Sequence, residues 1–484
     1  MTIPTTITAM KQGLAAGDFT AVDIVNAAFD RIEATDEAIH AFISTNKDYA
    51  LEQARLADER GYGENAPLLN GIPVAIKDNI LTIDFPTTAA SKMLDDFTPV
   101  YDAHVVTRLK EAGAIILGKL NLDEFAMGGS TETSYFGTTM NPWDVSRVAG
   151  GSSGGSGATV AARQVPASLG TDTGGSVRNP ASFNGIVGMK PTYGAVSRYG
   201  VIAFGSSFDQ VGPMTLTVED NALLLEVLAG YDAHDMTSLP DLDTNFSKYI
   251  GESIKGMKIA FPKEFKSEQV RPAVREQIIA AAKYFEEQGA IVEEVSLPTA
   301  KYGINVYYIM ASAEAASNLQ RFDGMRYGYR SPNATNVEEI FVKSRSEGFG
   351  DEVKRRIMIG TYTLGAGSFD HFYKKAGQVR TKIAQEMQAI FQDYDIIMGP
   401  TTLSTAFKAG EKMSNPMDMY LADLLTVLAN LTGIPAISIL AGFDEDHLPI
   451  GMQLMAKQGQ EARIYQLAHA YEVEHNFVDI EPSL

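Results

Sequence analysis

Two runs of glycine and serine in the middle of the chain constrain its fold more than any other feature. The first run, "AGGSSGGSGATV", covers residues 149–160, and the second lies in "GTDTGGSVRNPASFNGIVGMKPT", residues 170–192. Residues 118–212 hold 18 of the chain's 43 glycines. The first run continues directly into a small-residue helical pattern, so its backbone N–H groups would lie at a helix N-terminus. Neither flank has the polar, proline-rich composition of a tether. We therefore interpret residues 150–157 as a tight backbone nest and not as a linker.

The segments around these runs alternate between apolar strands and amphipathic helices. "GIPVAIKDNI" (71–80) and "AIILGKL" (114–120) predict buried strands, and "YDAHVVTRLKEAG" (101–113) predicts a helix between them. Thr20 and Asp23 form a capping-box pattern at the start of an earlier helix, and residues 303–393 read as mainly helical. This rhythm predicts an α/β fold whose sheet is covered by helices on both faces.

Charge and the N-terminal sequence limit the partners and the location. Sixty acidic against forty basic side chains give a net charge of −20, which argues against nucleic acid as a ligand of this chain alone. The N-terminal segment has no basic region followed by an apolar one, and no run approaches the roughly 18–20 apolar residues of a membrane span. We expect a cytoplasmic protein that does not enter a membrane.

The chain has no cysteine. This excludes disulfides, thiolate zinc sites and a cysteine nucleophile. A nucleophile, if the chain has one, must then be serine, threonine, lysine or a carboxylate. Gly150-x-Ser152-x-Gly154 fits the nucleophile elbow of α/β-hydrolases, which also needs an acid and a histidine downstream. Of the five histidines that follow, His447 is the one in a loop near a strand start. A phosphate-loop lysine and a dinucleotide fingerprint are both missing.

A lysine is the other base that a serine nucleophile can use. Lys77, Lys119 and Lys190 each follow a strand-like segment, so position alone does not choose among them. A free lysine has a pKa of about 10.4, and a base that works near neutrality must lose about 3 units. Burial between glycine-rich loops is a means of lowering it.

Three of these segments together are similar to the amidase signature family. They are "GIPVAIKDNI" with Lys77, "GGSSGGSGA" at 150–158 and "GTDTGGSVRNPASFNGIVGMKPT" at 170–192. The resemblance implies one α/β domain over residues 1–484 with a large mixed β-sheet, helices on both faces and a Gly/Ser-rich core at about 70–215.

The resemblance also implies a catalytic triad. Ser176 would be the nucleophile, Ser152 the bridging serine after a cis peptide bond with Gly151, and Lys77 the base. An oxyanion hole would be made by the backbone N–H groups of Thr173, Gly174, Gly175 and Ser176. We expect Ser153, Ser156 and Ser182 to be hydrogen-bonding loop residues.

Further segments resemble one branch of the family, the A subunits of tRNA-dependent amidotransferases. Among them are "EFAMGGSTETSYFGTTMNPWD" (124–144) and "EVKRRIMIGTY" (352–362). The branch implies a substrate-binding set of Met127, Gly128, Gly129, Tyr307, Arg356 and Asp423. Gly129 departs from the branch, which often has serine there, and so removes a possible side-chain contact with substrate. Without the resemblance, Arg356 and Asp423 would be interpreted as ordinary helix-surface charges.

The function implied is that of a glutaminase within a heterotrimer. It would hydrolyse free glutamine and supply ammonia for the conversion of Glu-tRNA(Gln) to Gln-tRNA(Gln). A B subunit would use ATP and magnesium and hold the misacylated tRNA, a C subunit would brace the two, and this chain would need no metal or cofactor. Two alternatives are a stand-alone amidase for another small amide, which would keep Lys77, Ser152 and Ser176, and a non-enzymatic scaffold.

Overall fold

The computed structural model describes residues 3–412 and 416–484 and is built on one large mixed sheet. The sheet has 11 strands in the order β1-β3-β2-β6-β8-β7-β12-β13-β11-β9-β10. Their bounds are β1 (Phe42–Thr45), β2 (Pro73–Lys77), β3 (Ile115–Leu120), β6 (Ala167–Asp172), β7 (Val187–Lys190), β8 (Gln210–Thr215), β9 (Lys258–Pro262), β10 (Ile291–Val295), β11 (Ile396–Pro400), β12 (Ala436–Phe443) and β13 (Pro449–Ala456). A separate two-stranded sheet pairs β4 (Met140–Asn141) with β5 (Asp144–Val148).

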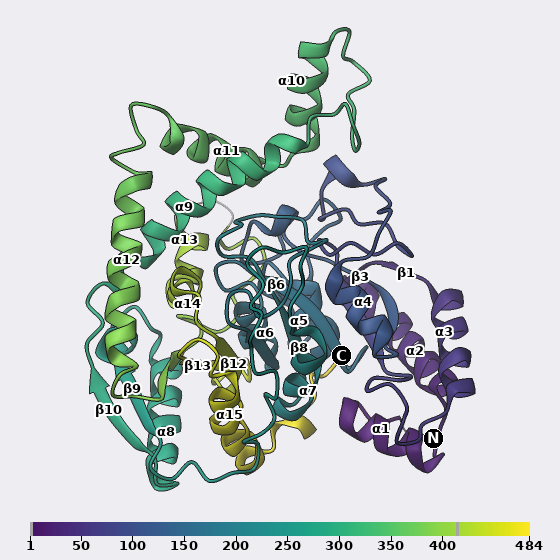
Figure 1. The fold of residues 1–484 in the computed structure, drawn as a ribbon, viewed down its shortest axis with the longest axis vertical. Coiled ribbons are helices and arrows are strands. Elements are labelled where there is room, and N and C mark those ends of the chain that lie inside the picture. The colour runs from purple at the N-terminus through teal and green to yellow at the C-terminus, as the bar shows by residue number, and fades with distance from the viewer. Residues whose placement is uncertain (1–2, 413–415) are drawn as a thin grey trace.

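Helices surround the sheet (Figure 1). They are α1 (Ile7–Ala16), α2 (Ala21–Ile39), α3 (Lys47–Arg60), α4 (His104–Glu111), α5 (Gly154–Ala161), α6 (Arg178–Asn184), α7 (Val218–Leu228), α8 (Pro272–Glu287), α9 (Gly303–Asn318), α10 (Val337–Gly348), α11 (Asp351–Leu364), α12 (Tyr373–Ile390), α13 (Pro416–Tyr420), α14 (Val427–Thr432) and α15 (Glu461–His475). The capping box of Thr20 and Asp23 is confirmed at the start of α2.

Both faces of the sheet are buried, as the sequence predicts. Along β2, Val74 and Ile76 belong to the core cluster that α1, α4, α7, α8 and α15 cover, whereas Ala75 belongs to the cluster under α2, α3, α5 and α6. This alternation follows from the two-residue period of a strand. The α/β fold with a mixed sheet covered on both sides is therefore confirmed.

The pairing of β2 brings the two Gly/Ser runs together. β2 is parallel to β3 on one side and to β6 on the other, with Ile76 opposite Leu169. Because parallel strands end at the same edge, Lys77 and the loop that follows β6 leave the sheet side by side. The first Gly/Ser run enters α5 at Gly154, so the predicted nest over residues 150–157 is wrong for 154–157, which are helical because these small residues let the first turn of α5 pack closely against its neighbours. α5 packs on β2 and β6.

The stretch predicted to be mainly helical holds α9 to α12. α9 packs against both α11 and α12, and α10 projects beyond them at the top of the view (Figure 1). Throughout residues 3–412 and 416–484, no helix combines the length and the apolar character needed to cross a membrane.

Candidate active site

Lys77 is the last residue of β2 and is fully buried. Its Nζ lies 2.8 Å from Ser152 Oγ, and it lies 2.9 Å from Thr171 Oγ1 and 3.3 Å from the Thr171 carbonyl oxygen. Burial lowers the pKa of Lys77 to about 7, against the opposing effect of the carboxylates of Asp123, Asp172 and Asp209. The structure therefore places an amine that can be neutral near pH 7 in contact with a serine hydroxyl.

The two other candidate lysines are buried and have different partners. Lys119 forms an ion pair with Asp78, with 2.9 Å between Nζ and Oδ1, and also donates to Thr87 Oγ1. Lys190 Nζ donates to the carbonyl oxygen of Pro191 at 2.8 Å. The sequence alone did not show which of the three lysines is the candidate base. The structure shows that Lys77, and neither Lys119 nor Lys190, contacts a serine hydroxyl of the Gly/Ser runs.

Ser152 is held in a tightly packed turn. The Gly151–Ser152 peptide bond is cis, as the resemblance implies. A side chain at Gly151 would collide with the Asp123 carboxylate, which accepts the backbone N–H of Thr131 at 2.9 Å. Asp123 also donates its own backbone N–H to the carbonyl oxygen of Ser152 at 3.1 Å. Glycine at 151 is thus required by the close approach of a buried carboxylate.

The histidine alternative for Ser152 receives no support from the geometry. His447, the best placed histidine in the sequence, is exposed in the turn before β13, whereas Ser152 is fully buried with its Oγ on Lys77. Ser153 and Ser156 are hydrogen-bonded to backbone carbonyls as expected, and Ser156 does so from within α5 instead of a loop.

Ser176 lies in the loop between β6 and α6 and is 7% exposed, while Lys77 and Ser152 are fully buried. The backbone N–H of Ser153 donates to the carbonyl oxygen of Ser176 at 3.2 Å, which ties the two Gly/Ser runs together. Within the described part of the chain, the Ser176 hydroxyl has no hydrogen-bond partner, Ser152 Oγ included. Ser176 is the member of the predicted triad that a ligand can reach.

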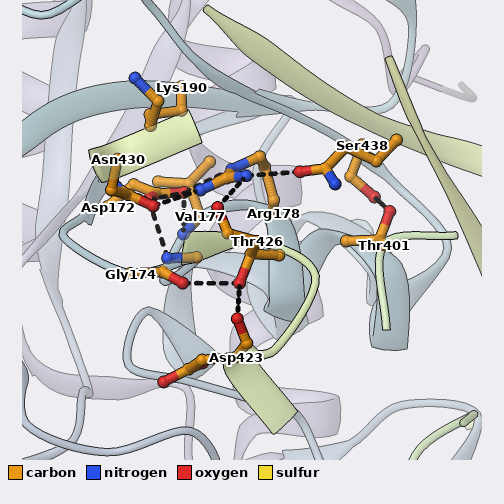
Figure 2. A network of polar contacts seen from close by, with 12 residues as sticks. Asp172, Gly174, Val177, Arg178, Lys190, Thr401, Asp423, Thr426, Asn430 and Ser438 are labelled. Atoms are coloured by element: carbon orange, nitrogen blue, oxygen red, sulfur yellow. Dashed lines mark hydrogen bonds and ion pairs between the residues drawn. The ribbon is translucent and has the colours of Figure 1, made fainter. Parts of the chain in front are cut away.

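A buried ion pair fixes the Ser176 loop. Arg178 donates Nε to Asp172 Oδ2 and Nη2 to Asp172 Oδ1, each at 3.0 Å, and both side chains have no exposure (Figure 2). Burial alone would raise the pKa of Asp172, but the charge and hydrogen bonds of Arg178 hold it at about 2. Asn430 and the Val177 N–H donate to the same carboxylate.

One of the four predicted oxyanion-hole groups is already used. The Gly175 N–H donates to Asp172 Oδ1 at 2.9 Å, so the expectation that this amide points at a ligand is wrong for this structure. The physical reason is that the same carboxylate that pairs with Arg178 needs further donors. The N–H groups of Thr173, Gly174 and Ser176 have no acceptor among the described residues. Three amides thus remain to receive a negative oxygen.

A cavity of about 340 Å³ lies at the segment 128–130, and Ser176, Arg356 and Asp423 are not among its lining residues. Gly128 and Gly129 line it, together with Glu352 and Tyr420, and a Cβ added to Gly129 would lie 3.3 Å from Met419 Sδ. Met127 does not line this cavity, because its side chain is fully buried in the apolar core. Two of the three residues predicted from this motif therefore face a ligand-sized space.

The other predicted pocket residues are buried and not on a helix surface. Arg356 on α11 and Asp423, in the turn Leu421–Asp423 after α13, are 2% and 8% exposed. Burial raises the pKa of Asp423 to about 7, against the effect of Tyr308 and Arg356. The ring of Tyr307 lies against the Ser176 loop, since a Cβ on Gly174 would be 2.5 Å from its Cζ.

Thr426 connects the Asp423 segment to the nucleophile loop. Its Oγ1 lies 2.6 Å from the carbonyl oxygen of Gly174 and 3.1 Å from that of Asp423 (Figure 2). Arg178 in turn donates to the carbonyl oxygen of Thr426 at 2.9 Å. The candidate pocket and the candidate nucleophile are therefore parts of one polar network.

Several site residues were not found by sequence reasoning. The Asp172–Arg178 pair stands inside the quoted motif, and its six-residue spacing across a turn was an available signal. Glu352 was also detectable, because it stands four residues before Arg356 on a helix. Asp209, which accepts from Thr173 Oγ1 at 2.7 Å, and Tyr420 have distant partners and gave no local signal. Among residues 3–412 and 416–484, no cluster of three or more His, Asp or Glu could hold a metal ion.

Comparison with known proteins agrees with this geometry. The family model described as Amidase matches residues 23–465. The chain is 54% identical over 479 residues to the A subunit of glutamyl-tRNA(Gln) amidotransferase of Streptococcus equi subsp. zooepidemicus, covering 99% of this chain and 98% of the relative. It is 54% identical to the same-named protein of Lactiplantibacillus plantarum, covering 96% of this chain and 95% of the relative. The crystal structure of the A subunit of glutamyl-tRNA(Gln) amidotransferase from Thermotoga maritima superposes with a TM-score of 0.78 at 43% identity, covering 93% of this chain and 91% of that one. From the match over most of its length, this chain belongs to the amidase family.

Proposed function

We propose that this chain is the glutaminase subunit of a tRNA-dependent amidotransferase, with Ser176, Ser152 and Lys77 as its catalytic residues. The observation that carries the proposal is the 2.8 Å contact between Lys77 Nζ and Ser152 Oγ, next to Ser153, whose N–H binds the carbonyl oxygen of Ser176. Such a contact gives a serine a base without histidine or cysteine. The names of the relatives at 54% identity support the choice of substrate and assembly.

The reaction begins with attack by the Ser176 hydroxyl oxygen on the side-chain amide carbon of glutamine. Ser176 gives its proton to Ser152 Oγ as Ser152 gives its own to neutral Lys77. The amide C=O becomes a tetrahedral oxyanion, which the N–H groups of Thr173, Gly174 and Ser176 receive. Loss of one such donor typically costs about 10²–10³ in rate.

The intermediate then collapses with release of ammonia. The C–N bond breaks, and the leaving nitrogen takes a proton passed from Lys77 through Ser152. Water then attacks the ester carbon and gives a proton through Ser152 to Lys77; the bond to Ser176 Oγ breaks, Ser176 takes that proton back, and glutamate is released. The proton that Lys77 gains in the first half of each step is returned in the second, so that the amine ends neutral.

Recognition of free glutamine needs a cation for its carboxylate and an anion for its ammonium group. Arg356 and Asp423, both buried, are the proposed anchors, with Tyr307 against Gly174. A planar guanidinium matches a carboxylate with two parallel hydrogen bonds. The backbone of Met127, Gly128 and Gly129 completes the proposed substrate-binding set.

The chain is proposed to work as one domain, residues 1–484, in a cytoplasmic heterotrimer with B and C subunits. The B subunit would bind misacylated tRNA, ATP and magnesium and use the ammonia to convert Glu-tRNA(Gln) to Gln-tRNA(Gln). The net charge of −20 on this chain supports the division, since a strongly acidic chain repels a phosphate backbone. The continuous 11-stranded sheet, which joins strands from β1 to β13, supports the single domain.

The test is ammonia release from L-glutamine by the chain alone and after co-purification with its native partners. We expect glutamine hydrolysis that rises with the B and C subunits and conversion of Glu-tRNA(Gln) by the complex. Hydrolysis of simple amides with indifference to partners and tRNA would instead identify a stand-alone amidase. If the co-purified complex hydrolysed no amide at all, the proposal that this chain is an enzyme would be rejected.

A further inference from the structure

Each of the two proposed charge anchors is held by a second residue that the sequence did not single out. Arg356 donates Nε to Glu352 Oε1 at 2.7 Å, one helical turn earlier on α11. Asp423 accepts the hydroxyl of Tyr308, from α9, on Oδ2 at 2.9 Å. Glu352 and Tyr308 thus each occupy one side of an anchor.

The two holding residues are themselves connected through Tyr420. The rings of Tyr308 and Tyr420 stack with centroids 4.0 Å apart and an interplanar angle of 25°. Tyr420 donates its hydroxyl to Oε1 of Glu352 at 3.0 Å, the same oxygen that receives Arg356 Nε. The contacts close a ring of Arg356, Glu352, Tyr420 and Tyr308, because the Arg356 guanidinium also packs on Tyr308, and Asp423 is attached to this ring through the Tyr308 hydroxyl.

The Arg356 guanidinium lies against the aromatic rings of Tyr308 and Tyr420 and not in water. Its Cζ is 4.6 Å from the centroid of Tyr308 and 5.1 Å from that of Tyr420, distances at which an aromatic face attracts a cation. The side chain of Arg356 is 3% exposed. Because Glu352 and the two rings restrict the guanidinium on several sides, it has one preferred orientation.

What the ring leaves unused is the part of each anchor that a ligand needs. Among the described residues, the two Nη atoms of Arg356 donate no hydrogen bond, and Oδ1 of Asp423 accepts none. Glu352 and Tyr420 also line the cavity of about 340 Å³, together with Gly128 and Gly129 of the proposed substrate-binding set. The Nη atoms of Arg356 and Oδ1 of Asp423 can therefore bind a ligand, while Nε and Oδ2 hold each side chain in place.

The ring also ties together three separate segments. Tyr308 comes from α9, Glu352 and Arg356 from α11, and Tyr420 and Asp423 from the segment 416–423. The bond from Tyr420 to Glu352 joins the segment that carries the anionic anchor directly to the helix that carries the cationic one.

We propose that Glu352, Tyr420 and Tyr308 are positioning residues that fix the orientation of Arg356 for an α-carboxylate and of Asp423 for an α-ammonium group, and so select amino-acid amides over simple amides. This inference rests on the proposed function. The three residues act through the anchors, and none of them is assigned a contact with the reacting amide. Their effect therefore belongs to substrate binding and not to the chemical step.

The decisive variant is Tyr420→Phe, which keeps the stacked ring and removes only the hydroxyl bonded to Glu352. A hydrogen bond to a charged group is lost, so we expect the KM for glutamine to rise about tenfold while kcat changes less than about twofold. The inhibition constant of L-glutamate, which carries both α-groups, is expected to rise in parallel. Glu352→Gln, which keeps an acceptor for Tyr420, is expected to raise KM less than Glu352→Ala.

Tyr394→Phe is the matched control, because Tyr394 donates a hydroxyl to Glu293 at 2.7 Å at the far end of the sheet. It removes the same kind of bond and is expected to leave both constants unchanged. Unchanged KM in Tyr420→Phe, or a fall in kcat without a rise in KM, would overturn the positioning role. A wild-type complex that leaves glutamine intact would instead remove the proposed function itself, so the two failures are distinguishable.

Discussion

Asp172 and Arg178 form a fully buried two-point ion pair on either side of Ser176. The pair closes the loop between β6 and α6, and its carboxylate also takes the N–H groups of Gly175 and Val177. A buried charge pair thus holds the two ends of the nucleophile loop together.

Removing one member of this pair is expected to unfold the loop. Arg178→Ala leaves the Asp172 carboxylate buried without its partner, which typically costs about 3–5 kcal/mol. The free energy of unfolding from chemical denaturation measures the loss, and glutamine hydrolysis should disappear with it. As a control, Arg326→Ala breaks an exposed pair with Asp323 and should cost less than about 1 kcal/mol. Equal losses in the two variants would contradict the structural role of the buried pair.

The two serines of the proposed triad can be separated from neighbouring serines. Ser176→Ala should abolish ammonia release and acyl-enzyme formation, and Ser152→Ala should reduce the rate by several orders of magnitude, because proton transfer to Lys77 is lost. Thermal unfolding should change little in either variant. Ser182→Ala removes a buried hydroxyl that contacts Thr402 and should keep its activity. Turnover by Ser176→Ala would reject the nucleophile.

Lys77 and Lys119 should respond in opposite ways to the same change. Among the described residues, Lys77 has no carboxylate within ion-pair distance, so Lys77→Met should abolish activity without loss of stability. Lys119→Met leaves Asp78 unpaired in the core and should cost about 3–5 kcal/mol of unfolding free energy. Circular dichroism during denaturation and an ammonia assay on both proteins give the comparison. Retained activity in Lys77→Met would move the base elsewhere.

The pH dependence should show two groups on its acidic side. Burial lowers the pKa of Lys77 to about 7 and raises that of Asp423 to about 7. The base must be neutral and the anchor ionised, and both conditions are met as the pH rises through 7. The logarithm of kcat/KM should therefore rise with a slope of about two below pH 7 and level off above it. In Asp423→Asn the slope should fall to about one, and an unchanged slope would exclude Asp423.

Gly174 should tolerate no side chain. A methyl group there would lie 2.5 Å from Cζ of Tyr307, so Gly174→Ala must displace either the tyrosine or the amides of the nucleophile loop. We expect a fall of about 10²–10³ in kcat/KM. Gly377→Ala, at an open position of α12, is the control and should be neutral. A fully active Gly174→Ala protein would show that the loop is not close-packed.

The sequence predicts the fold well where a signal is local. The strands around Lys77 and Lys119, the helix between them and the capping box at Thr20 are all observed where the periodicity places them. The short β4 and β5 were not predicted, since β4 has only two residues and β5, "DVSRV", is polar and largely unburied and shows no apolar run.

The site is less accessible to such reasoning. Three lysines at strand ends look alike in sequence, and only partners many residues away, Ser152 for Lys77 and Asp78 for Lys119, tell them apart. The engagement of Gly175 by Asp172 was missed because the motif shows which amides are present but not which acceptors compete for them. Tyr420 is 68 residues from Glu352, and no local pattern links them.

The register of β2 against β6 is what aims the base. Lys77 shares its side of the sheet with Ala75, under α5 and α6, where the first Gly/Ser run lies. Deleting or inserting one residue within β2 would turn the amine toward the opposite layer, among Val74 and Ile76. Changing the length of this five-residue strand should therefore be as damaging as replacing one of the proposed catalytic side chains, whereas insertions should be tolerated in the surrounding loops.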